Sequence, residues 1–148
     1  MTHREKAEEL FLSGYNCAQA VLCAYTDITG LDSETSKRIA SSFGGGMGKL
    51  REACGAVTGG FAVLGLLYGD YDVNDNSQKS EHYARVRAAA ERFKEQFGTI
   101  NCESLLQGIA NAKGADPAER NAEYYKSRPC LRFVGAMCDI LDDYIESK

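Results

Sequence analysis

Histidine is scarce in this 148-residue chain, with two copies, and tryptophan is missing altogether. His3 stands near one end of the sequence, and His82 lies in a charged stretch that is typical of an exposed helix face. With so few histidines, no Ser-His-Asp or Cys-His arrangement and no H-E-x-x-H zinc motif can be drawn. Conventional nucleophilic or metal-assisted hydrolysis therefore finds no support in the sequence.

Long apolar runs and rows of basic residues are also missing. The most apolar stretch, residues 56–69, is too short to span a bilayer and is interrupted by glycines. The charged first residues lack the apolar region of a signal peptide. The net charge is −4 and no stripe of Lys and Arg is present, which argues against nucleic-acid binding. We therefore expect a cytoplasmic protein without membrane insertion, a setting in which structural disulfides are uncommon.

No segment alternates polar and apolar residues for long enough to predict a β-strand. Apolar residues recur with helical spacing nearly throughout, separated by glycine, proline and capping residues. We predict an all-α fold with a single domain over residues 1–148, a bundle of five to seven helices. In the amphipathic stretch before Gly98, Tyr83, Phe93 and Phe97 are expected to face inward. The helical stretches cover residues 3–12, 17–28, 31–43, 56–69, 80–98, 102–109, 116–126 and 129–147.

Two segments resemble ligand-binding loops but do not meet their requirements. The stretch "FGGGMGKL" has Phe43 where a P-loop needs its first glycine, and Leu50 where Ser or Thr should follow the lysine. Residues 70–81 place oxygen-bearing side chains at the ligand positions of an EF-hand calcium loop, but Asp75 replaces the required glycine. We expect neither nucleotide nor calcium binding, and interpret 70–81 as a polar connection with a helix cap.

Cysteine, in contrast, is abundant, with six copies. At the start of a helix, unpaired N–H groups and a partial positive charge favour a thiolate, which lowers the pKa of a thiol there and makes it a better ligand and nucleophile. Cys23 and Cys138 lie deeper within helices, where cysteine usually serves as a small buried hydrophobe. The other four stand at or near expected helix starts: Cys17, Cys54, Cys102 and Cys130.

Glycines surround Cys54. Because glycine allows positive φ and close approach, one group could turn backbone N–H groups toward an anion or a cluster sulfide. A tight interhelical loop explains the same glycines equally well. This group consists of Gly44, Gly45, Gly46, Gly48 and Gly55. In the apolar stretch, the pairs Gly55/Gly59 and Gly65/Gly69 would let another helix approach closely.

Five segments, "GYNCAQAVL", "FGGGMG", "CGAVTGGFAVLGLLYG", "NCESLL" and "CLRFVGAMCDIL", occur in this order. Together they resemble the C_GCAxxG_C_C family of redox-active proteins, over a region from Gly14 to Leu141. The resemblance implies a redox role. Members of that family are often encoded near transporter genes, and related helical modules resemble iron–sulfur carriers. The four characteristic cysteines of the family fall on Cys17, Cys54, Cys102 and Cys130.

Three interpretations of these four thiols stay open, because their spacing matches neither a zinc-finger pair nor a ferredoxin run. We favour an iron–sulfur cluster on all four, used for electron transfer or redox sensing. The alternatives are a metal-free thiol–disulfide protein, in which Cys54 attacks and another of the four resolves, and a zinc site that makes the chain a structural module. We also expect a redox partner protein, a functional link to a transporter and, from the glycine-faced and aromatic helices, a homodimer.

Overall fold

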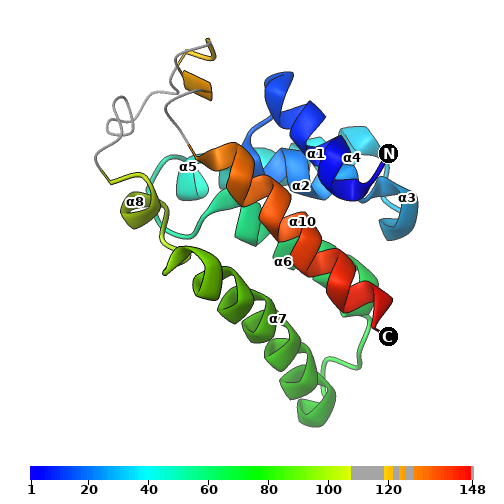
Figure 1. The fold of residues 1–148 in the computed structure, drawn as a ribbon. Coiled ribbons are helices and arrows are strands. Elements are labelled where there is room, and N and C mark those ends of the chain that lie inside the picture. The colour runs from blue at the N-terminus through cyan, green and yellow to red at the C-terminus, as the bar shows by residue number, and fades with distance from the viewer. Residues whose placement is uncertain (108–118, 122–123, 126–128, 148) are drawn as a thin grey trace.

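The structure, a computed structural model, describes residues 1–107, 119–121, 124–125 and 129–147 (Figure 1). This part of the chain is helical and contains no strand, so the predicted all-α fold is confirmed. Six helices within the described ranges have eight residues or more, and short helices of four residues come in addition, so the predicted number of five to seven holds for the long helices alone. None of the described helices is long and apolar enough to cross a membrane. In chain order the elements are α1 (His3–Leu12), α2 (Cys17–Ala24), α3 (Thr26–Thr29), α4 (Ser33–Ala40), the 3-10 turn η1 (Ser41–Phe43), α5 (Gly44–Met47), α6 (Gly55–Tyr68), α7 (Asn76–Phe97), α8 (Cys102–Leu105) and α10 (Cys130–Glu146).

Helix α2 forms the centre of the molecule, packed against α1, α4 and α6, while α10 runs along α1 and α6 (Figure 1). The residues of α2 are mostly small and apolar, and all but Cys17 and Gln19 are buried. Helix α6 approaches α2 closely, since a Cβ on Gly59 would lie 2.8 Å from the carbonyl oxygen of Ala18. The packing role of the pair Gly55/Gly59 is thus confirmed.

The predicted packing role of Gly65/Gly69 is wrong. No atom lies within 4 Å of a Cβ placed on Gly65, and the atoms nearest to one on Gly69 belong to Gly65 of the same helix. Helix spacing alone identifies two glycines on one face, but it does not tell whether another helix covers that face. Helix α2 lies against the glycine face of α6 at Gly55 and Gly59, near the start of α6, but not at Gly65.

Helix α7 begins four residues earlier than predicted, because Asp75 Oδ1 accepts a hydrogen bond from the backbone N–H of Gln78 and caps the helix there. The predicted helix cap is therefore confirmed, whereas the predicted connection over 70–81 is shorter than expected, because residues 76–81 already belong to α7. Tyr83 is 53% exposed, which overturns its predicted inward position. The buried residues of α7 all lie in its second half, while in its first half Arg85 donates a hydrogen bond to the Tyr144 hydroxyl of α10 at 2.7 Å. The helix expected over 116–126 and the end of the one over 102–109 lie largely outside the described residues.

Candidate functional site: a cavity lined by four thiols

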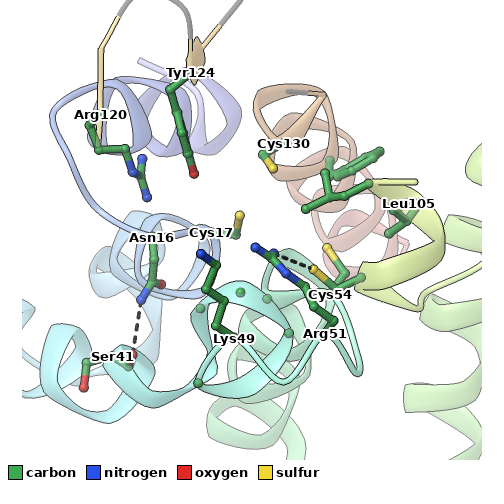
Figure 2. Close-up of a pocket in the computed structure, with 18 residues that line it drawn as sticks. Asn16, Cys17, Ser41, Lys49, Arg51, Cys54, Leu105, Arg120, Tyr124 and Cys130 are labelled. Carbon is green, nitrogen blue, oxygen red and sulfur yellow. Dashed lines mark hydrogen bonds between the residues drawn. The ribbon is translucent and has the colours of Figure 1, made fainter. Parts of the chain in front are cut away.

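Four helices begin around one cavity of about 310 Å³ (Figure 2). Cys17, Cys102 and Cys130 are the first residues of α2, α8 and α10, and Cys54 is the N-cap of α6. The structure therefore brings together the four cysteines that the sequence singled out, and all four line the cavity. The remaining two, Cys23 and Cys138, are buried outside its lining.

Backbone pairing places Cys54 beside Cys102. The N–H of Cys54 donates to the carbonyl oxygen of Ile100 at 2.7 Å, and the N–H of Cys102 donates to that of Glu52 at 2.6 Å. A single antiparallel bridge lies between these two bonds. Since the bonds fix the chain directly before α6 and α8, both thiols are held by main-chain contacts between segments far apart in sequence.

A capping box positions Cys17. The side chain of Asn16 accepts a hydrogen bond from the N–H of Gln19, whose side chain in turn accepts one from the N–H of Asn16. The Asn16 amide also donates to the carbonyl oxygen of Ser41 at 3.3 Å, as Figure 2 shows. This second contact ties the start of α2 to the segment that leads into the glycine loop.

The glycine loop is a left-handed turn along the cavity wall. Gly45, Gly46 and Gly48 have φ of 67°, 72° and 62°, which confirms the predicted positive φ at these positions. Gly44 is an exception, with φ of −67°. Three residues with side chains share the left-handed conformation at a cost of about 1–2 kcal/mol each; they are Met47, Lys49 and Arg51. The cavity is also lined by all five glycines of the predicted group: Gly44, Gly45, Gly46, Gly48 and Gly55.

Three cations extend into the cavity, and none of them was predicted from the sequence. Lys49, Arg51 and Arg120 line it, whereas no Asp or Glu of the described residues does. Nη1 of Arg51 donates to Sγ of Cys102 at 3.3 Å (Figure 2). Lys49 and Arg51 adjoin the glycine loop and could have been noted for that reason. Arg120 carries no such signal, because only the tertiary fold brings it to Cys17.

Burial favours the protonated form of two of the four cavity thiols, Cys17 and Cys54. A hydrogen bond with Cys130, together with burial, raises the pKa of Cys17 well above its ordinary value, although the charge of Arg120 opposes this. Burial raises the pKa of Cys54 to about 12. The backbone N–H groups of Ala56 and Val57 lower that pKa, as a helix start should, but burial outweighs them. The predicted low pKa of Cys54 is therefore wrong in this state.

The described part of the chain includes all six cysteines, and none of them forms a disulfide there. Within the same ranges, no three Cys, His, Asp or Glu side chains are grouped tightly enough to hold a metal ion. The thiols therefore surround the cavity and do not converge on one point.

No curated protein and no solved structure matches the chain. One protein family does, over residues 15–144, a region that contains every residue of the cavity lining. Its description is "Putative redox-active protein (C_GCAxxG_C_C)". Because the match covers most of the sequence, the chain belongs to the C_GCAxxG_C_C family.

Proposed function

We propose that this protein holds an iron–sulfur cluster through Cys17, Cys54, Cys102 and Cys130 and serves in electron transfer or redox sensing. The observation that carries the proposal is that four thiols from four separate segments line one cavity. Four cysteine thiolates are the usual ligand set of [2Fe–2S] and [4Fe–4S] clusters, which supply one-electron chemistry. The redox partner protein and the transporter link implied by the family resemblance belong to the same proposal.

The charges around the thiols fit such a group. Nε of Arg51 and Nη1 of Arg120 are buried without a hydrogen-bond partner among the described atoms. Buried donors of this kind are costly unless an acceptor meets them, and deprotonated thiols or sulfides are acceptors. Together with Lys49, the two arginines offset the negative charge that deprotonation of the thiols would bring into the cavity.

The residues that line the cavity differ in the roles we assign to them. Leu105, Leu106 and Phe133 form an apolar part of the lining that keeps water from the thiols. Arg51 donates to the Cys102 sulfur, and hydrogen bonds to ligand sulfurs raise the reduction potential of a cluster. A Cβ on Gly46 would lie 2.7 Å from Cβ of Cys102, so glycine is needed for the loop to pass this thiol.

The same geometry favours a cluster over a single zinc ion. Zinc draws four thiolates to about 2.3 Å from one point, which leaves a closed site. Here the thiols are spread around a cavity of about 310 Å³, and the described side chains form no group of three suited to one ion. A cluster, whose four thiolates are shared among two or four iron atoms, accommodates ligands that are further apart.

A metal-free thiol–disulfide protein is the second candidate, and one observation favours it. The Cys17 and Cys130 thiols are hydrogen-bonded to each other, which identifies a pair that the sequence alone could not. On oxidation both thiols would lose their protons, an S–S bond would form, and two electrons would pass to a disulfide of a partner protein. The pKa of the Cys17 thiol and that of the Cys54 thiol are both raised, so the hydrogen bond to Cys130, and not the pKa, favours Cys17 as a member of the pair.

One experiment separates these candidates. Protein purified without oxygen is assayed for iron, labile sulfide and zinc, and its absorption spectrum is recorded. Iron and sulfide with broad absorbance near roughly 400 nm support the cluster. Zinc without iron, or no metal at all, refutes it. In the metal-free case, mild oxidation followed by peptide mapping should show a bond between Cys17 and Cys130.

Two matched variants test the assignment of ligands. Cys54→Ser should abolish iron and sulfide binding, because it removes a thiol that lines the cavity. Cys23→Ser should leave both unchanged, because Cys23 is buried away from the cavity, with Sγ 3.8 Å from the carbonyl oxygen of Ser33. Equal metal content in the two variants would show that the division of the six cysteines into four and two is incorrect.

A further inference from the structure

The first half of α7, residues 76–86, is attached to the body by polar contacts. In the described part of the chain, the residues that α7 adds to the apolar core all follow this half: Ala89, Phe93 and Phe97. Within the first half, the guanidinium carbon of Arg85 lies 4.6 Å from the ring centre of Tyr68 in α6. Its Nε donates to the hydroxyl of Tyr144 in α10 at 2.7 Å. Arg85 therefore joins the first half of α7 to both neighbouring helices.

His82 supplies an acceptor for this arginine. The side chain of Arg85 is 11% exposed, and its Nη1 donates to Nδ1 of His82 at 2.9 Å. The carboxylate of Glu81 also pairs with Arg85, but it is 73% exposed and lies 3.8 Å from Nη2. A guanidinium has only donors, so Nδ1 of His82 is unprotonated in this contact and the ring is neutral. A nearly buried cation thus depends on the neutral form of a histidine.

The elements packed around this contact bring no carboxylate to His82 in the described contacts. The titratable side chains that face the pair from neighbouring elements are Tyr71 of the connection before α7, Tyr68 of α6 and Tyr144 of α10. Tyrosine hydroxyls stay neutral in acid. Asp143 of α10 pairs with Arg92 in the second half of α7, at 2.9 Å. A protonated His82 would therefore face Arg85 without an opposite charge to stabilise it.

Protonation of His82 would remove the acceptor and add a positive charge. Nδ1 would become a donor, so Nη1 of Arg85 would lose its partner, and two cations would stand 2.9 Å apart. Burial and the charge of Arg85 lower the pKa of His82 from its ordinary 6.5. Because the pKa is lower in the folded protein, the stability that the neutral ring contributes is complete above about pH 6.5 and is lost as the pH falls through the folded value.

We propose that His82 and Arg85 form a pH-sensitive latch, which holds the first half of α7 against α6 and α10 at neutral pH and releases it in mild acid. The second half stays packed, because its apolar residues belong to the core. The opening is therefore local and leaves the rest of the fold in place. The latch goes beyond the proposed cluster and does not depend on it, because neither of its residues lines the thiol cavity.

Hydrogen exchange of the full chain, followed by mass spectrometry at about pH 7.5 and about pH 5.5, tests the latch. After correction for the intrinsic effect of pH, the amides of residues 76–86 should exchange at least about threefold faster at the lower pH, whereas those of α2 should not. His82→Asn should abolish this effect, because Oδ1 is a neutral acceptor as many bonds from the backbone as Nδ1. His3→Gln is the matched control and should retain it, because the His3 ring contacts Asp27 and Asp142 instead.

Three results would overturn the latch. The first is unchanged exchange of residues 76–86 between the two pH values in the unmodified chain. The second is an equal acid effect in His82→Asn, which would show that another group titrates. The third is an acid effect of the same size in every helix, which would indicate general destabilisation. Should His82→Asn fail to fold by circular dichroism, His82→Gln takes its place with the same expected result.

Discussion

Replacing Gly46 by alanine tests whether the glycine loop is built around the thiol cavity. Gly46 is buried with φ of 72°, a conformation that costs a residue with a Cβ about 1–2 kcal/mol. The new Cβ would lie 2.7 Å from Cβ of Cys102 and 2.8 Å from Cα of Arg51. Two of the three nearest atoms belong to the backbone of residues 51 and 52, which cannot rotate away as a side chain can.

The expected loss of stability is the sum of these two effects. Overpacking in a well-packed interior costs about 1–3 kcal/mol. Added to the conformational cost, Gly46→Ala should lower the free energy of unfolding by about 2–5 kcal/mol. Gly30→Ala is the matched control, since Gly30 has φ of 77° but a Cβ placed on it would have no atom within 4 Å. The control should lose only the conformational part, about 1–2 kcal/mol.

Urea denaturation of both variants at one pH measures the difference, provided that the two transitions have the same slope. Iron content adds a second readout. Gly46→Ala would displace the Cβ of Cys102 and with it a proposed ligand, so the iron content should fall. Gly30→Ala would displace no residue of the cavity, so the iron content should stay the same. Equal destabilisation of the two variants would refute the reasoning. It would mean that the loop can shift away from Cys102 at no cost.

Three further predictions concern other parts of the molecule. Burial raises the pKa of Cys138 to about 12 from an ordinary 9.0, so its contribution to stability is complete below about pH 9 and is lost as the pH rises toward 12. For one thiol the loss is about 1.4 kcal/mol per pH unit, and Cys138→Ala should flatten the dependence of the free energy of unfolding in urea on pH in that window. His3 joins three helices, with ring nitrogens 2.9 Å from both Asp27 and Asp142, so His3→Gln should lower the free energy of unfolding by about 1–3 kcal/mol, and an unchanged urea midpoint would contradict this. In cluster-bearing protein, Arg51→Gln should lower the reduction potential measured by spectroscopic titration, because a positive donor to the Cys102 sulfur is lost; a rise would show that Arg51 does not act on the cluster.

The helices and the four cavity cysteines could be predicted because both depend on signals that are local in the sequence. Asn16 caps α2 with its own side chain, and Cys17 follows it directly. Apolar residues at helical spacing define α6 in the same way, and Gly98 ends α7 with φ of 88°. Each of these features is determined within a few residues, so its physical cause is visible before the chain folds.

The features that could not be predicted depend on contacts between distant segments. Arg120 reaches the cavity only because the chain returns to the start of α2, and nothing around it in the sequence indicates that. The pKa of Cys54 was misjudged because a helix start is visible in the sequence but its burial is not. Arg51 has a positive φ, and its carbonyl oxygen accepts a hydrogen bond at 3.3 Å from the N–H of Glu103 in α8, a contact between segments far apart in the sequence.

Burial and charge both favour the proposed use of the four thiols as cluster ligands over their use as nucleophiles. A thiol that attacks substrates must be ionised at neutral pH and exposed, whereas burial raises the pKa of Cys54 to about 12. A thiol that binds a metal releases its proton to the solvent as the metal takes the place of that proton, so the pKa of the thiol in the metal-free protein sets how strongly metal binding depends on pH. Arg51 and Arg120 then supply the positive charge that a set of buried thiolates requires. Uptake of iron should accordingly release protons, and a pH-indicator dye in weakly buffered solution should detect them only in protein that retains Cys54.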